Sequence, residues 1–228
     1  MKPSETTTSF DFIGAAPTPA RVQRKTPIGT GIALVLWLAV VVGATILMTR
    51  YSSTPGTGGP APITWPKDSQ ILFDCNRPTL VMFAHPHCPC TRASLGELER
   101  LLAQVPGGLS AHVVFLKPQG TTADWEKTEL WRKASSIPGA SVCTDNAGIE
   151  ARRFHAETSG QTLLYDPAGN LLFQGGITFA RGHAGDNPGC TALKELLREG
   201  HSNQVKTPVF GCGLFEAQCQ KGDVLCKP

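Results

Sequence analysis

Charge is scarce in this sequence. Only 17% of its 228 residues are Asp, Glu, Lys or Arg, and the formal net charge is +3. A protein that binds nucleic acid usually presents a concentrated basic field, and no such field is evident here. The composition therefore argues against nucleic acid as the partner. The length is sufficient for one domain with its own hydrophobic core.

Charge is missing altogether from residues 28–48, IGTGIALVLWLAVVVGATILM. As a helix this run measures roughly 31 Å at ~1.5 Å per residue, which matches a hydrocarbon core of about 30 Å. Arg21, Arg24 and Lys25 precede it, whereas Arg50 is nearly alone after it. This bias predicts a single-pass bacterial inner-membrane protein with a cytoplasmic N-terminus and a periplasmic C-terminal part. A cleaved signal peptide is the alternative, but the run is long for one and no small-x-small cleavage site follows it.

No cysteine precedes the apolar run, and all eight follow it: Cys75, Cys88, Cys90, Cys143, Cys190, Cys212, Cys219 and Cys226. An oxidising compartment allows disulfides to persist, which fits export. Eight cysteines can pair in about 105 ways, so spacing does not define the pairing of the six cysteines other than Cys88 and Cys90.

Composition divides the chain into five parts. We expect a cytoplasmic tail over residues 1–27, the membrane helix over 28–48 and a flexible Gly/Pro/Ser/Thr-rich linker over 49–68. One folded domain should follow over 69–205, and a Cys-containing tail over 206–228 should dock on it through disulfides.

Strand-like and helix-like runs alternate within the domain. Short apolar runs predict strands, and apolar residues at helical spacing predict helices. The Asp-Pro-Ala-Gly-Asn sequence between two apolar runs indicates a hairpin, and Asn187-Pro188 indicates a helix start. The expected strands are 71–75, 79–84, 111–117, 140–145, 161–165 and 171–175, and the expected helices are 89–105, 122–135, 146–154 and 188–198. This order predicts an α/β domain with a mixed sheet.

The sequence Cys88-Pro89-Cys90 falls between a strand and a helix. A helix N-terminus favours thiolate over thiol, and a Cys-x-Cys disulfide closes a small, strained ring that suits exchange better than structure. We expect Pro89 at the first helical position, Cys88 as the more exposed and more acidic N-cap nucleophile, and Cys90 as the resolving thiol. In the alternative interpretation, both cysteines form structural disulfides with partners such as Cys75 or Cys143.

His85 and His87 precede the two cysteines directly. A histidine can lower the pKa of a neighbouring thiol, or it can simply lie on the surface of the loop. Imidazole and thiolate together also suit copper(I), so His85, His87, Cys88 and Cys90 form an alternative metal site.

Three stretches together resemble the RedB-type branch of the thioredoxin-like superfamily: AHPHCPCTRAS, ETSGQTLLYDPAGNLLFQGGIT and RGHAGDNPG. The resemblance implies a three-layer thioredoxin-like domain and thiol-disulfide exchange with protein clients. It also implies that Arg181, His183 and Asp186 lie at the edge of the site near the cysteines. Two departures are evident, because His87 stands where the first cysteine of Cys-x-x-Cys is expected and Gln161 stands in place of the cis-proline.

Three functions therefore remain open. The first is a membrane-anchored periplasmic thiol-disulfide oxidoreductase that needs no cofactor. The second is a copper-binding or copper-delivery protein, and the third is a non-catalytic exported binding domain with structural disulfides.

Overall fold

The computed structural model describes residues 28–215. Outside these described residues lie the N-terminal tail expected over 1–27, Cys219 and Cys226. The chain divides into two compact units at Ala44, and each is described by itself. Helix α1, Ile28–Ser53, is long and apolar enough to cross a membrane, with a mean hydropathy of 2.5 over its best window, and a signal sequence would have the same properties. It extends five residues beyond the expected end at residue 48.

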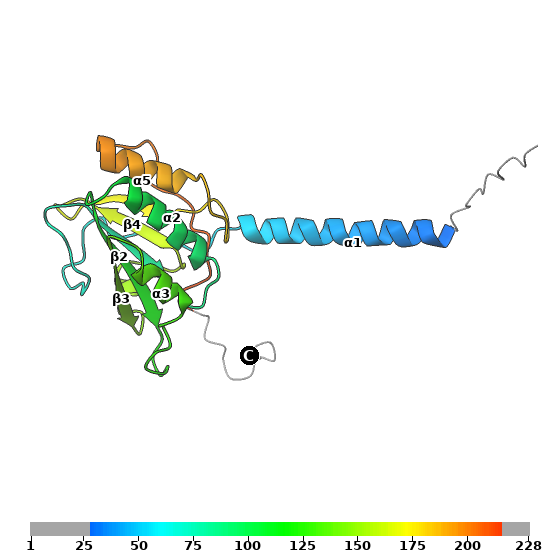
Figure 1. Ribbon diagram of the computed structural model, residues 1–228, viewed down its shortest axis with the longest axis horizontal. Coiled ribbons are helices and arrows are strands. Elements are labelled where there is room, and N and C mark those ends of the chain that lie inside the picture. The colour runs from blue at the N-terminus through cyan, green and yellow to red at the C-terminus, as the bar shows by residue number, and fades with distance from the viewer. Residues whose placement is uncertain (1–27, 216–228) are drawn as a thin grey trace, which may run out of the picture. The chain divides into compact units, whose positions relative to one another are not determined.

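The second unit contains a five-stranded mixed sheet with the strand order β3-β2-β1-β4-β5 (Figure 1). Strands β1, β2 and β3 are parallel, β4 is antiparallel to β1, and β5 is antiparallel to β4. The elements after α1 are β1 Thr79–Ala84, α2 Thr91–Gln104, β2 Ser110–Lys117, α3 Glu129–Ser135, β3 Ala140–Asn146, α4 Ile149–Arg153, β4 Gln161–Tyr165, β5 Leu171–Gly175 and α5 Pro188–Glu199.

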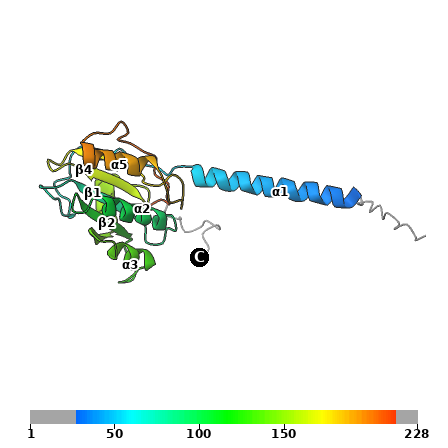
Figure 2. The same ribbon diagram turned by 45° about the horizontal axis from the view of Figure 1, so that its top comes forward.

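Both faces of the sheet are covered, which makes three layers. Every residue of the central strand β1 is buried, because its alternate side chains enter two separate cores. On one face Leu80 and Met82 pack with apolar residues of α2, α3 and α5, and Figure 2 shows α2 and α5 over this face. On the other face Val81 and Phe83 pack with Phe154 beside α4. The predicted α/β three-layer architecture with a mixed sheet is confirmed.

Three expected elements differ from the structure. Residues 71–75 form no strand, and residues 146–154 contain only the short helix α4, which begins after Gly148 in the left-handed conformation at φ 68°. The helix expected over 122–135 forms only at Glu129–Ser135. Residues 122–128 adopt turns, because the Lys117 ammonium forms an ion pair with Glu126 at 3.1 Å and donates a hydrogen bond to the Ala123 carbonyl. These tertiary contacts outweigh local helix propensity.

The expected flexible linker is wrong in its second half, which packs on the sheet. Trp65 lies 4.9 Å from Phe73, 5.1 Å from Phe154 and 5.2 Å from Tyr165, measured between ring centroids. The Tyr165 hydroxyl donates to the Pro62 carbonyl at 3.0 Å. Apolar side chains spaced among Gly and Pro residues therefore complete the core on the α4 face.

The C-terminal segment, defined here as residues 206–215, also packs on the domain. Lys206 forms a bridge with Gln174, the Gly56 amide donates to the Val209 carbonyl at 2.8 Å, and Leu214 is buried. The structure contains no disulfide among the six described cysteines. Within the described residues, backbone hydrogen bonds and apolar burial hold this segment on the domain.

Candidate functional site

The Cys-Pro-Cys motif occupies the turn between β1 and α2. The Cys88 amide donates to the His85 carbonyl at 3.1 Å, and the Thr91 amide donates to the Cys88 carbonyl at 3.1 Å. These are tight i to i+3 bonds, and helix α2 starts only at Thr91 with Cys90 as its N-cap. The expectation that Cys88 caps the helix with Pro89 at the first helical position is therefore wrong by two residues.

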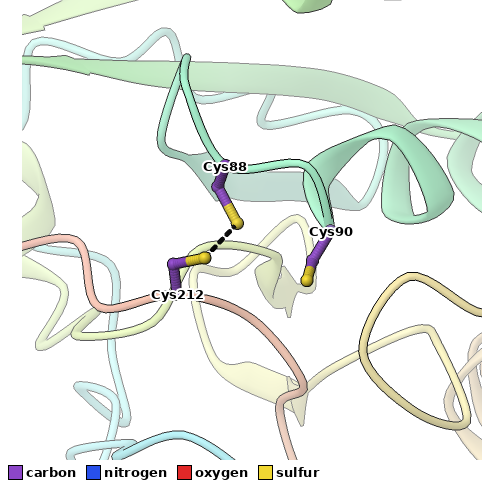
Figure 3. A group of neighbouring side chains, drawn as sticks. All are labelled: Cys88, Cys90 and Cys212. Carbon is purple, nitrogen blue, oxygen red and sulfur yellow. Dashed lines mark hydrogen bonds between the residues drawn. The ribbon is translucent and has the colours of Figure 1, made fainter. Parts of the chain in front are cut away.

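Three sulfur atoms meet at this turn (Figure 3). The Cys88 Sγ lies 2.8 Å from the Cys212 Sγ, and those two atoms and the Cys90 Sγ all lie within 4.8 Å of one another. Cys212 is 124 positions beyond Cys88. The sequence-based predictions did not connect Cys212 with the motif. Val209 and Leu214, the buried apolar residues on either side of it, are the signal that could have shown a packed segment.

Cys88 is more buried than Cys90, contrary to expectation. The two side chains are 2% and 8% exposed, respectively. The C-terminal segment explains the difference, because it brings Cys212 into contact with Cys88. A pairing of Cys88 or Cys90 with Cys75 or Cys143 is not formed, since all four thiols are free.

The loop before β4 holds the C-terminal segment in place. The Ser159 amide donates to the Cys212 carbonyl and the Leu214 amide donates to the Glu157 carbonyl, both at 2.8 Å. Between these bonds Thr158 and Gly213 form an antiparallel bridge. The Ser159 hydroxyl also accepts from the His85 amide at 2.9 Å, so one loop positions both the cysteine motif and the C-terminal segment.

The three thiols have different acidities. Burial raises the pKa of Cys88, but hydrogen bonds from the Cys212 thiol and from the amides of Cys212, Cys90 and Thr91 outweigh it, so the net pKa is lowered. Burial and then the Cys88 charge raise the pKa of Cys90. Burial, followed by the hydrogen bond to Cys88 and its charge, raises the pKa of Cys212 to about 12. Cys88 thus has the lowest pKa of the three thiols, and its sulfur lies in hydrogen-bond contact with the Cys212 thiol.

Arg181 is the residue of the RGHAGDNPG loop that acts on the sulfurs. Its positive charge lowers the pKa of Cys90 and of Cys212 against the other effects. Its guanidinium donates to the Gly211 carbonyl, next to Cys212. His183 and Asp186 are exposed, and the His183 Nδ1 lies 2.9 Å from the Arg181 carbonyl oxygen.

The two histidines of the motif face Trp125 rather than the sulfurs. The ring centroids of His85 and His87 lie 5.6 Å and 4.5 Å from that of Trp125, and the His87 Nε2 lies 3.2 Å from the Trp125 carbonyl oxygen. Within residues 28–215, the group of donors close enough to share a metal ion is Cys88, Cys90 and Cys212. The expected His-His-Cys-Cys set is therefore corrected to three sulfurs.

Gln161 is buried at the start of β4. Its amide oxygen accepts from the Glu157 amide at 3.2 Å, and its amide nitrogen donates to the His155 carbonyl at 3.3 Å. Both ends of the amide are thus engaged by the loop before β4. The described residues contain no cis peptide bond.

The arrangement has a thioredoxin-like fold. A parallel β1-α2-β2 unit is followed by the β4-β5 hairpin and α5, and the cysteine motif lies at the β1-α2 junction. No protein-family model matches the sequence, and no curated protein matches it.

Solved structures share the fold. A hypothetical protein from Sinorhizobium meliloti 1021 is 16% identical, with a TM-score of 0.55 over 69% of this chain and 96% of that one. An uncharacterised conserved protein from Geobacillus kaustophilus is 17% identical, with a TM-score of 0.53 over 71% of this chain and 92% of that one. A secreted disulfide oxidoreductase of Mycobacterium tuberculosis is 15% identical and has a TM-score of 0.36 over 43% of this chain and 68% of that one. The shared fold rests on the first two structures, and at their identities the likeness shows the fold alone.

Proposed function

We propose that this protein is a thiol-disulfide oxidoreductase in which Cys88 is the nucleophile and protein thiols or disulfides are the clients. The observation that carries the proposal is a thiol of lowered pKa with two further thiols within 4.8 Å of it. A thiolate is the attacking species in thiol-disulfide exchange, and a second thiol in the same chain completes the exchange. The three sequence motifs further support membership of the RedB-type branch.

The chemistry is a two-electron exchange. The Cys88 thiolate attacks one sulfur of a client disulfide, which forms a mixed disulfide and releases the other client sulfur as a thiolate. A second thiol of the chain then attacks the Cys88 sulfur, releases the remaining client sulfur and leaves an intrachain disulfide. The client disulfide is thereby reduced and the protein dithiol oxidised, and the reverse sequence oxidises a client dithiol.

A groove beside the motif provides room for a client. Its volume is about 530 Å³, and His85, Trp125, Leu214 and Phe215 are among the residues that line it. Aromatic rings and polar side chains line it together, so a client can be offered both stacking and hydrogen-bonding partners. In this proposal His85 contributes to client binding rather than to metal binding.

The exchange is tested with the reduced full-length protein in detergent and a small aromatic disulfide that releases a coloured thiolate. All variants carry Cys75→Ser, Cys219→Ser and Cys226→Ser, which removes the exposed Cys75 thiol and the two thiols beyond residue 215 from the reaction. In this background Cys88→Ser should slow the release by at least about 100-fold, because the remaining thiols near the site have raised pKa values. Cys143→Ser is the matched control, since Cys143 is a free thiol within β3. Equal rates in Cys88→Ser and the wild type would exclude Cys88 as the nucleophile. Few rapidly reacting thiols in all variants would favour the non-catalytic binding domain.

The proposed location is the bacterial inner membrane, with the thioredoxin-like domain in the periplasm. The basic residues before the apolar run support this orientation. A reporter enzyme that is active only in the periplasm, fused after residue 60, should be active. Activity of a cytoplasm-specific reporter at the same position would overturn both the orientation and the oxidising environment.

A second candidate function is copper(I) binding by Cys88, Cys90 and Cys212, which the mutual proximity of the three sulfurs favours. Soft thiolates are preferred ligands of copper(I). The test is the copper content of the full-length protein after copper(I) loading under reducing conditions. Binding by the sulfurs predicts one copper per chain, lost in Cys212→Ser and retained in the His85→Ala/His87→Ala double variant. Absence of bound copper in the wild type would exclude this candidate.

A further inference from the structure

Cys212 is the thiol placed to complete the exchange at Cys88. Its Sγ lies 2.8 Å from the Cys88 Sγ, and the two residues are 124 positions apart (Figure 3). A bond between them therefore closes a long loop, whereas a Cys88–Cys90 bond closes a ring that contains only Pro89 between its cysteines. Small rings force a disulfide away from its preferred geometry.

The geometry points to Cys212 as the resolving thiol, carried on the C-terminal segment, which clients must displace. This inference rests on the oxidoreductase function proposed above. In place of Cys90, Cys212 would attack the mixed disulfide at Cys88. The oxidised resting form would then contain a Cys88–Cys212 disulfide, with Cys90 as a free thiol.

A positive charge lies beside Cys212. The Arg181 guanidinium donates a hydrogen bond to the carbonyl of Gly211, the residue before Cys212. A cation at this position stabilises an attacking thiolate. The proton of Cys212 passes to the released client thiolate or to water.

The backbone pairing explains how Cys212 can move aside and return. Residues 212–214 pair with residues 157–159 through two backbone hydrogen bonds and one bridge, and Cys88 beneath them is only 2% exposed. A client disulfide cannot approach a thiol this buried, so the C-terminal segment must open first. A few hydrogen bonds at the edge of a loop cost little to open, and they guide Cys212 back to the same position.

The attack step is balanced within the chain and its client. The Cys212 thiolate attacks the Cys88 sulfur, the Cys88–client bond breaks, and the client leaves with the bonding electron pair as a thiolate. Two electrons pass from the Cys88 and Cys212 sulfurs to the client disulfide over the whole half-reaction. Cys90 is not consumed.

The experiment measures the lifetime of mixed disulfides in the full-length protein. Reduced wild type, Cys212→Ser, Cys90→Ser and the control Cys75→Ser each react with a cysteine-containing peptide disulfide, and adducts at Cys88 are quantified by mass spectrometry after acid quenching. We expect the adduct of Cys212→Ser to live about 100-fold longer than that of wild type, because the resolving thiol acts at high effective concentration. Adducts of Cys90→Ser and Cys75→Ser should decay at the wild-type rate.

A second measurement needs no variant. Peptide mapping of the wild type after one equivalent of oxidant should recover the Cys88–Cys212 linkage. Three outcomes would overturn the role of Cys212 and leave Cys88 as the nucleophile. They are long-lived adducts in Cys90→Ser instead of Cys212→Ser, equal adduct lifetimes in these two variants, and an adduct lifetime that increases only when Cys219 or Cys226 is replaced. Absence of adducts in every variant, with unchanged reactivity in Cys88→Ser, would overturn the oxidoreductase function itself.

Discussion

Replacement of Gly211 by alanine should loosen the C-terminal segment and expose Cys88. A Cβ atom at this position would lie 1.9 Å from the Ser159 carbonyl oxygen and 3.2 Å from the Thr158 Cγ2. Ordinary contacts begin at 3.4 Å, so the two backbones would have to separate by about 1.5 Å. The Ser159 carbonyl belongs to the loop that positions the motif, and it has little freedom to yield.

This separation would break the hydrogen bonds from Ser159 to Cys212 and from Leu214 to Glu157. At about 0.5–1.5 kcal/mol each, their loss lowers the free energy of opening by about 1–3 kcal/mol. Since about 1.4 kcal/mol corresponds to a factor of ten, the open population should rise by about 5- to 150-fold. A buried thiol reacts only from the open form, so its modification rate should rise by the same factor.

The assay is alkylation of the reduced full-length protein with iodoacetamide, followed by mass spectrometry of the Cys88 peptide. Gly213→Ala is the matched control, because its Cβ would meet only the Phe215 carbonyl oxygen at 3.5 Å, an ordinary contact. Gly211→Ala should accelerate Cys88 modification, and Gly213→Ala should leave it close to wild type. An unchanged rate in Gly211→Ala would refute the idea that this segment controls access to Cys88.

Three further predictions follow from single features. Arg181→Gln removes the positive charge that lowers the pKa of Cys212, so mixed disulfides at Cys88 should persist several-fold longer by mass spectrometry, and Arg181→Lys should restore part of the rate. Trp65→Ala should lower the free energy of unfolding by about 2–4 kcal/mol in urea titrations, because Trp65 packs on three aromatic rings of the domain. A change below about 0.5 kcal/mol would show that residues 59–68 behave as a flexible linker. Burial raises the pKa of Cys190 to about 11 from an ordinary 9.0, so the stability that the protonated thiol contributes is complete below pH 9 and is lost as the pH rises toward 11. The urea midpoint of Cys190→Ala should therefore fall less steeply between pH 9 and 11 than that of wild type, and parallel curves would contradict the shift.

Local sequence patterns were sufficient for much of the fold. The hairpin strands Gln161–Tyr165 and Leu171–Gly175 have the bounds expected from their apolar runs and the turn residues between them. The last helix begins at Pro188, and the Asn187 side chain caps it by accepting from the Cys190 amide at 2.8 Å. Such features depend on interactions between residues a few positions apart, so the signal is contained in the local sequence.

The helix at 122–128 and the linker show where local patterns fail. Helical spacing around Trp125 predicted a helix, but the Lys117–Glu126 ion pair holds this stretch in turns. The Gly- and Pro-rich composition before residue 68 predicted a flexible linker, yet Trp65 packs against Phe154 and Tyr165 of the domain. In both places the partner comes from another element, and composition carries no information about which partner is near.

The sequence by itself determined that a cysteine motif lies between a strand and a helix, after an apolar run long enough for a membrane span. Only the tertiary structure decided which thiols share the site. It brings Cys212 to Cys88 from 124 positions away, turns His85 and His87 toward Trp125, and places Arg181 beside the C-terminal segment. The physical reason is that the pKa of a thiol depends on its burial and on neighbouring charges, and disulfide exchange depends on the distance between two sulfur atoms. At this site, both are set by the pairing of the loop before β4 with the C-terminal segment.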